Sequence, residues 1–161
     1  MGWHAGERAA KESKKQKSFL AVRGEKLECL KRLCLEITKS KDGLHWCEVE
    51  MAMQNIMDHY AGNARSAPML RRGAERLKDI KQNISFRAES AHELMRCLEV
   101  RSVLDNAEMI LMASRERTES RKAPFGFFRA DFPEQDDKNW LAFLALKLEG
   151  QEFKFSKIPV K

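Results

Sequence analysis

The stretch that most constrains the fold of this chain lies between Ser90 and Thr118. Ser90 and Glu93 have the spacing of a capping box, in which two side chains satisfy backbone amides at the start of a helix. Apolar residues then recur at helical spacing, namely Leu94, Cys97, Leu98, Val103, Leu104, Ala107, Ile110 and Leu111. A stripe of this width predicts that residues 91–118 form the central helix of a bundle.

Other segments have the same period and predict helices near residues 3–16, 23–38, 45–59 and after a Ser66 cap. The apolar positions expected to face the core are Leu27, Leu30, Cys34 and Ile37; Trp46, Val49, Met53, Ile56 and Met57; and Met69, Leu70, Ala74, Leu77 and Ile80. Gly and Pro are scarce, which also favours helix. The first helix begins without a cap, although its small residues predict a close-packing face.

The period changes after Pro133. Residues 140–148 and 151–160 read as two extended runs joined by a tight turn at Glu149-Gly150. An isolated hairpin is only marginally stable in water, so we expect it to lie on the bundle or on another domain. The sequence therefore predicts a mainly α fold, a helical bundle of three to five helices with a C-terminal β-hairpin.

Composition excludes several classes of protein. No apolar run is long enough to span a bilayer and no signal peptide opens the chain, so we expect a cytoplasmic protein without a membrane span. The cysteines form no C-x-x-C pair and lie among core-like neighbours, which predicts buried free thiols; they are Cys29, Cys34, Cys47 and Cys97. The net charge of +6 is interleaved with acidic residues on helix faces, which does not favour specific nucleic-acid binding.

No catalytic, cofactor-binding or metal-binding residue emerges from the sequence. A Gly-rich phosphate loop, a nucleophile elbow and metal-ligand spacings are all missing. The best candidates for a functional role follow the long helix in ESRKAPFGFFRADFP, from Glu119 to Pro133. These docking or structural candidates are Arg121, Phe125, Phe127, Phe128, Arg129 and Asp131. The arginines can bind an anion in a fork, but we favour pairing with Glu119, Asp131 or helix-end carbonyls.

Several stretches together resemble the C-terminal helical region of the fumarate reductase and succinate dehydrogenase flavoprotein family, which includes L-aspartate oxidase and adenylylsulfate reductase. They are LHWCEVEMAMQNIMDHYAGNARS (Leu44–Ser66), AHELMRCLEVRSVLDNAEMIL (Ala91–Leu111), then ESR, RADFP and DDKNW (Asp136–Trp140). Many members have a shorter stretch, with Gly and His, between the two arginines. The longer aromatic stretch here resembles the adenylylsulfate reductase-like and unclassified branches more closely than succinate dehydrogenase.

The resemblance implies a domain division: residues 1–17 as the last helix of an FAD-binding domain, 18–135 as the helical bundle and 136–161 as the hairpin extension. It also implies that FAD belongs to the parent family, and that no FAD or substrate ligand lies in this chain, which is inactive in isolation. The implied partners are an FAD-binding domain or subunit and, further, an iron–sulfur subunit. The alternative is a free-standing helical module that binds protein or nucleic acid. In the favoured reading the phenylalanines form a partly exposed docking patch beside the first helix.

Overall fold

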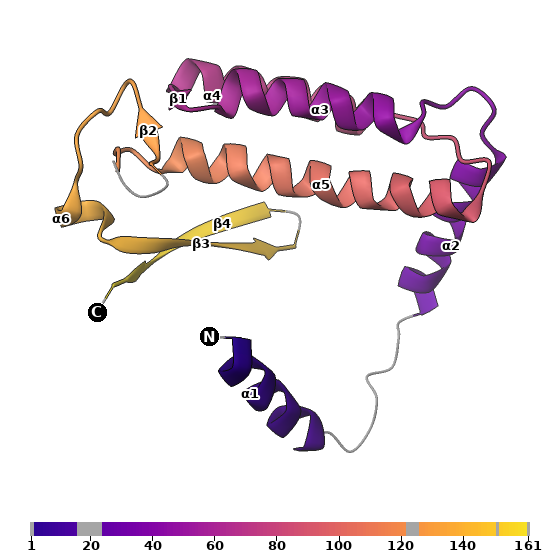
Figure 1. Ribbon diagram of the computed structural model, residues 1–161, viewed down its shortest axis with the longest axis horizontal. Coiled ribbons are helices and arrows are strands. Elements are labelled where there is room, and N and C mark those ends of the chain that lie inside the picture. Colours follow the sequence, from indigo (N-terminus) through magenta and orange to yellow (C-terminus); the bar gives the residue numbers. More distant parts are fainter. Residues whose placement is uncertain (1, 16–23, 122–125, 151, 161) are drawn as a thin grey trace. The chain divides into compact units, whose positions relative to one another are not determined.

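The computed structural model describes residues 2–15, 24–121, 126–150 and 152–160 (Figure 1). The chain divides into two compact units, Met1–Leu35 and Glu36–Lys161. The first unit contains helix α1 (Gly2–Lys15) and the beginning of helix α2 (Gly24–Lys39). No residue of α1 is buried. The expected apolar face of α2 is only partly realised, because Leu27 and Leu30 are exposed while Ile37 is buried.

Three long helices build the second unit, namely α3 (Trp46–Ala61), α4 (Ala67–Asn83) and α5 (Ala91–Glu116). They pack side by side, with α4 antiparallel to the other two (Figure 1). The most deeply buried side chains of this bundle core are Val49, Leu70, Leu77, Cys97, Val100, Leu104 and Leu111. Each of the three helices contacts the other two, so the expectation that residues 91–118 form the central helix stays a prediction.

Two features of the bundle differ in detail from the sequence-based expectation. Val103 and Ile110 on α5 are 40% and 48% exposed, so the apolar stripe of that helix is wider than its buried face. The Ser90 side chain accepts a hydrogen bond from the Glu93 amide as expected, but the Glu93 carboxylate accepts from the Glu89 amide instead of the Ser90 amide. Of the two hydrogen bonds of the predicted capping box, the one accepted by the Ser90 hydroxyl is therefore present, and the one from the Ser90 amide to Glu93 is replaced.

The strands form two small sheets. β1 (Ala64–Arg65) and β2 (Phe128–Arg129) pair in parallel, a contact that the sequence analysis did not predict. Helix α6 (Asp137–Trp140) then leads into the antiparallel hairpin of β3 (Ala142–Glu149) and β4 (Glu152–Pro159). Gly150 turns the hairpin with a positive φ of 67°, which L side chains rarely adopt.

The predicted fold class, mainly α with a C-terminal hairpin, is confirmed. The hairpin begins later than expected, because Trp140 lies in α6 and not in a strand. β3 contacts α5, so the hairpin lies on the bundle as expected (Figure 1). None of the four cysteines, all of which lie in the described ranges, forms a disulfide, but only Cys97 is buried and Cys29 is exposed, which corrects the expectation that all four thiols are buried. Across the described ranges, no helix has the length and hydropathy to cross a bilayer.

Candidate functional site: the polar corner after helix α5

The side chain of Arg129 lies fully inside the protein although it carries a charge. It is 1% exposed and pairs with Asp131 through two hydrogen bonds of 2.8 Å, from Nε and from Nη2. Nη1 donates to the carbonyl oxygens of Ser114 at 2.7 Å and Arg117 at 2.8 Å. The last carbonyls of a helix have no partner within the helix and carry partial negative charge. Arg129 therefore caps the C-terminus of α5 and neutralises Asp131.

Asp131 connects this ion pair to a second helix. Its Oδ2 accepts a 2.8 Å hydrogen bond from the Ala67 amide, at the start of α4. The hydrogen bond from Arg129 is the main cause that lowers the pKa of Asp131 from 3.8 to about 2, and the Ala67 amide adds to it. Ser66 occupies the N-cap position, but its side chain makes no capping bond. The prediction that the Ser66 side chain caps α4 is therefore wrong. The Asp131 carboxylate, which is distant in sequence, accepts the hydrogen bond at the start of this helix instead.

Arg65 contacts the C-terminal end of a third helix, α3. Its Nε donates to the carbonyl oxygens of Ala61 at 2.9 Å and Gly62 at 3.0 Å, where α3 ends. The Arg65 carbonyl accepts from the Ala130 amide at 2.7 Å, which continues the pairing of β1 with β2. The segment 127–131 thus ties together the C-terminus of α3, the N-terminus of α4 and the C-terminus of α5.

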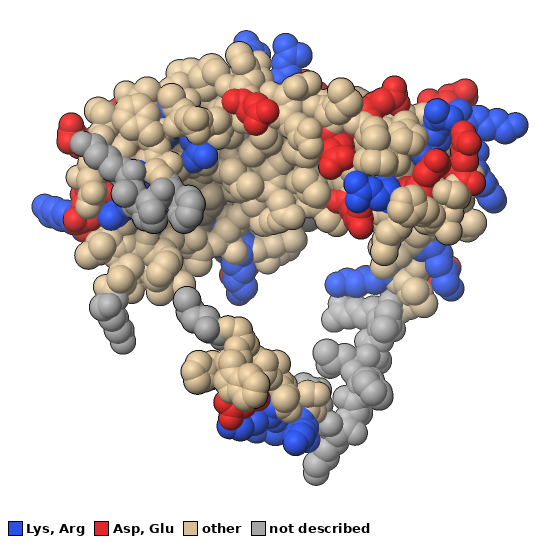
Figure 2. Space-filling model, viewed as in Figure 1, with Lys and Arg blue, Asp and Glu red and all other residues tan. Residues whose placement is uncertain are grey.

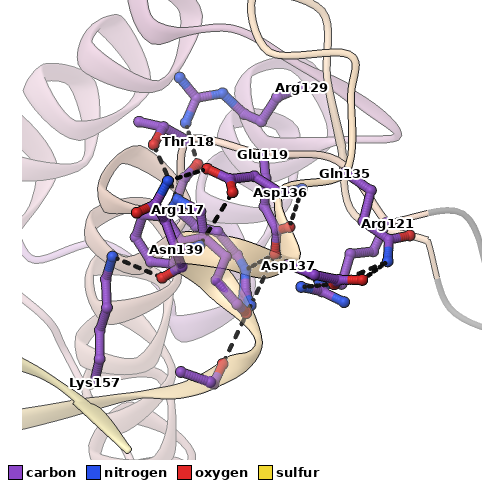
Figure 3. A network of polar contacts seen from close by, with 12 residues as sticks. Arg117, Thr118, Glu119, Arg121, Arg129, Gln135, Asp136, Asp137, Asn139 and Lys157 are labelled. Atoms are coloured by element: carbon purple, nitrogen blue, oxygen red, sulfur yellow. Dashed lines mark hydrogen bonds and ion pairs between the residues drawn. The ribbon is translucent and has the colours of Figure 1, made fainter. Parts of the chain in front are cut away.

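Glu119 is the centre of a second polar cluster (Figure 3). Its side chain is 0% exposed, and Oε1 accepts from Arg117 Nε at 3.0 Å and Arg121 Nε at 2.7 Å. Oε2 accepts from the Asp136 amide at 3.0 Å. Arg121 also forms an ion pair of 3.0 Å with Asp137, and the bond to Glu119 is the first cause that raises its pKa. The expected pairing of both arginines within the chain is confirmed.

Trp140 joins this cluster to the hairpin. Its ring is buried, and its indole N–H donates to the Thr118 hydroxyl at 3.2 Å. Lys157 Nζ lies 3.4 Å from the ring centroid, and the Arg117 guanidinium carbon lies 5.3 Å from it. Arg117 also donates to the carbonyls of Trp140 and Ala142. Cations over an indole face are attracted by the ring electrons, so the hairpin base is held by polar contacts and by cation–π contacts.

The phenylalanines of the corner lie nearer the surface. Phe127 is half-buried beneath the Arg65 guanidinium, which is 4.9 Å from its ring centroid, and its backbone bridges to Arg121. Phe128 is 44% exposed and Phe132 is 40% exposed. Phe125 lies outside the described residues. For Phe127 and Phe128 the expected partial exposure is observed. The expectation that these rings lie beside the first helix stays a prediction.

The chemistry available at the corner is that of a structural scaffold. Arg129 uses all three guanidinium nitrogens inside the chain, and Glu119 has both oxygens occupied. Neither group is free to bind an anion or to transfer a proton. Within the described part of the chain, no group of His, Cys, Asp and Glu could hold a metal ion.

The arginines and phenylalanines of the corner are recognisable from the sequence, whereas the central position of Glu119 and the helix-capping role of Asp131 were not predicted. Both roles depend on partners distant in the sequence, such as Ala67 and Asp136. The one available signal was the unusual density of Arg, Glu and Asp between aromatic residues in 117–137.

The family model described as the fumarate reductase flavoprotein C-terminus matches residues 50–161. The chain belongs to this family of flavoprotein C-terminal domains.

Two curated relatives are similar over most of this chain. The succinate dehydrogenase flavoprotein subunit of Rickettsia bellii is 28% identical over 112 residues, which cover 66% of this chain and 18% of that protein. The fumarate reductase flavoprotein subunit of Mycobacterium tuberculosis is 28% identical over 137 residues, 81% of this chain and 23% of that protein. The chain thus corresponds to only about a fifth of the length of these relatives.

Solved structures share the fold. Adenylylsulfate reductase from Archaeoglobus fulgidus superimposes with a TM-score of 0.86 at 24% identity, covering 98% of this chain and 28% of that chain. Sdh1 from Mycobacterium smegmatis gives a TM-score of 0.79 at 20% identity, covering 95% and 27%. At these identities the similarity concerns the fold.

Proposed function

We propose that this chain serves as a helical docking domain for the FAD-binding part of an oxidoreductase, and that it supplies neither a catalytic residue nor an FAD ligand. The observation that carries the proposal is the contrast at the corner. Its charged groups are used inside the chain, while Phe128 and Phe132 remain 44% and 40% exposed beside them. Apolar side chains on a rigid, internally satisfied scaffold are suited to contact another protein surface.

The rigidity of this surface follows from its backbone. Phe128 lies in β2, which pairs with β1, and the Phe127 amide and carbonyl both bond to Arg121. Phe132 lies 5.1 Å beneath the Arg129 guanidinium. Rings held in this way lose little conformational freedom on binding, which lowers the entropic cost of association.

The partner that we infer is an FAD-binding catalytic domain or subunit, with an iron–sulfur subunit as a further candidate. Support comes from the curated relatives, which are named flavoprotein subunits and extend well beyond the region matched by this chain. The parent enzyme's substrate class would be that of fumarate reductase, succinate dehydrogenase or adenylylsulfate reductase. The cytoplasmic location expected from the sequence stays a prediction.

Specific nucleic-acid binding is not part of this proposal. On the face drawn in Figure 2, most of the surface is uncharged, and at its right-hand end Lys and Arg side chains lie among Asp and Glu side chains. We therefore expect binding to duplex DNA to be weak and to vanish at about 200 mM salt, because phosphate contacts alone are strongly salt-dependent. Sequence-selective binding at that salt concentration would instead support a free-standing nucleic-acid module.

The cofactor part of the proposal is tested with the purified full chain and free FAD. Equilibrium dialysis should show no saturable binding, because FAD-binding folds cradle the pyrophosphate on a glycine-rich turn between a strand and a helix. Flavin that co-purifies in stoichiometric amount would refute the statement that this chain lacks an FAD ligand.

The docking part is tested with a defined probe, the Rickettsia bellii succinate dehydrogenase flavoprotein subunit expressed without the region that matches this chain. The full chain should form a complex with it in analytical ultracentrifugation. Phe128→Asp should weaken this complex at least about tenfold, since a buried ring is worth roughly 1.5–3 kcal/mol. Met95→Asp is the matched control, because Met95 is 57% exposed on the first half of α5, away from the corner. Equal weakening by both variants, or no complex at all, would argue against docking through the corner.

A further inference from the structure

The segment between α2 and α3 and the segment before α5 lie at the opposite end of the bundle from the corner (Figure 1). There the chain leaves α2 and passes the segment that precedes α5. The two segments line a cavity of about 500 Å³ that is open to solvent, and Lys39, Lys41 and Glu89 on its rim are exposed. Its lining residues are Thr38, Lys39, Ser40, Lys41, Arg87, Ala88 and Glu89. All of them belong to the second unit.

Backbone hydrogen bonds fix the walls of this cavity. The Leu44 amide donates to the Ser85 carbonyl at 2.7 Å, and the Arg87 amide donates to the Leu44 carbonyl at 3.1 Å. The Ala88 amide donates to the Ile37 carbonyl at 3.3 Å. Segments 37–44 and 85–88 are therefore held against each other, so their side chains start from a defined frame.

Gly43 makes this close approach possible. A Cβ atom at this position would lie 2.4 Å from the Phe86 carbonyl carbon and 2.7 Å from the Arg87 nitrogen. Both are backbone atoms and cannot move aside without shifting the whole segment. Only glycine lets the Lys41 wall lie this close to the Arg87 wall.

The cavity gathers positive charge. Lys39, Lys41 and Arg87 line it against a single carboxylate, Glu89, which accepts a 2.9 Å bond from Arg87 Nη1. In the described part of the chain, Lys39 and Lys41 have no carboxylate partner. Lys81 shows the contrast, since it pairs with two carboxylates of α5. Cations that share one cavity repel each other, and a bound anion relieves that repulsion.

We propose that this cavity binds a phosphate group, either inorganic phosphate or the phosphate of a small ester. Lysine ammonium groups act as point charges toward phosphate, and a guanidinium offers a fork of donors. The half-buried Ser40 hydroxyl adds a neutral donor in the same wall. The volume is within the range of about 300–1,000 Å³ that small-molecule sites occupy.

A lysine at position 39 can be explained without a bound anion, so Lys39 is not a suitable residue for testing the proposal. Lys39 is in the last turn of α2, where a cation also offsets the helix dipole. That explanation does not extend to Lys41, which lies after the helix, or to Arg87, which lies before α5. The test therefore uses Arg87, Lys41 and Glu89.

The experiment titrates the full chain with inorganic phosphate and, separately, with glycerol 3-phosphate at constant ionic strength, followed by amide chemical shifts. Shifts of the Ser40 and Arg87 amides should saturate. Arg87→Gln should weaken binding at least about tenfold, equal to roughly 1.4 kcal/mol, and Glu89→Gln should strengthen it. Lys78→Gln is the control, since it removes the same charge from an exposed position on α4. Tighter binding of glycerol 3-phosphate than of phosphate would identify an ester site.

Several results would overturn the proposal. They are the absence of saturable shifts at an anion concentration on the order of 10 mM, equal weakening by Arg87→Gln and Lys78→Gln, or unchanged affinity in Glu89→Gln. The far-UV circular dichroism of each variant checks its folding. If Arg87→Gln does not fold, Lys41→Gln and Glu89→Gln decide the question, because they should change affinity in opposite directions.

Discussion

Side chains of the bundle core and of the polar corner are buried to the same extent, but those of the core are apolar and those of the corner are charged. Leu77 and Leu111 of the bundle are each 1% exposed, and Arg129 and Glu119 of the corner are 1% and 0% exposed. In the bundle, burial removes apolar surface from water, an effect without direction. In the corner, burial is tolerated because each charge has an opposite charge and directed hydrogen bonds. The two regions should therefore respond differently to substitution.

The largest effect is expected for Arg129→Ala. It leaves the Asp131 carboxylate without its guanidinium partner, and the carbonyls of Ser114 and Arg117 without that donor. Breaking a buried ion pair by removing one partner costs about 3–5 kcal/mol, so urea unfolding should show a loss of that size. Arg72→Ala removes an exposed i,i+3 pair on α4 and should cost less than about 0.5 kcal/mol.

Conservative variants sharpen the comparison. Arg129→Lys keeps the charge but loses the fork, so it should recover only part of the loss. Leu104→Met in the bundle keeps the volume and should cost less than about 1.5 kcal/mol. If Arg129→Lys were as stable as the parent chain, the corner would depend on charge alone and not on directed bonds.

The second prediction concerns close packing in the bundle. A Cβ at Gly73 would lie 2.6 Å from the Cβ of Tyr60 and 3.1 Å from a methyl carbon of Leu111. Gly73→Ala should therefore destabilise the chain by about 1–3 kcal/mol in urea unfolding, despite the higher helix propensity of alanine. Gly6→Ala in α1 meets no atom within 4 Å and should cause no loss. A stabilised Gly73→Ala would mean that α3 and α4 can separate freely.

The same difference explains why the bundle and the hairpin can be predicted from the sequence and most contacts of the corner cannot. The bundle follows from periodicity, since Leu104 and Leu111 are spaced so that both lie on one face of α5. The hairpin follows from alternation, since Phe153 and Phe155 are half-buried and Lys154 is exposed. Such patterns are local, so they can be read from neighbouring residues.

The corner is not local in the sequence. Asp131 caps a helix that begins 64 residues earlier, at Ala67. Glu119 bonds to an amide 17 residues later, at Asp136. The sequence predicted pairing of Arg121 with Glu119 and of Arg129 with Asp131, because the two residues of each pair are only two positions apart. Helix-end carbonyls were also expected as partners of these arginines, but which helix ends are reached could not be predicted, since that depends on how three helices pack.

The third prediction uses the pKa of Asp131, which is lowered from 3.8 to about 2 chiefly by the bond from Arg129. A carboxyl with a depressed pKa contributes stability above its unfolded pKa, and the contribution is lost as the pH falls through the folded value. Its side chain is 27% exposed, so after screening we expect on the order of 1 kcal/mol to disappear between about pH 4 and pH 2. Urea unfolding at several pH values measures this loss. The stability difference between the parent chain and Asp131→Asn should shrink over that interval, and a constant difference would exclude the ion pair as its source.

The smallest effect on stability is expected at the surface of the corner. Phe128 is 44% exposed, and β2 pairs with β1 through the backbone, so Phe128→Asp removes few contacts and no hydrogen bond of the sheet. We expect a change in unfolding free energy within about 0.5 kcal/mol, as for most surface substitutions. The solubility of the isolated chain should rise, because a charge replaces an exposed ring. Phe127→Asp is the informative contrast, since that ring lies half-buried under Arg65 and its loss should cost more. If Phe128→Asp were as destabilising as Phe127→Asp, Phe128 would belong to the folded interior of the corner and not to a docking surface.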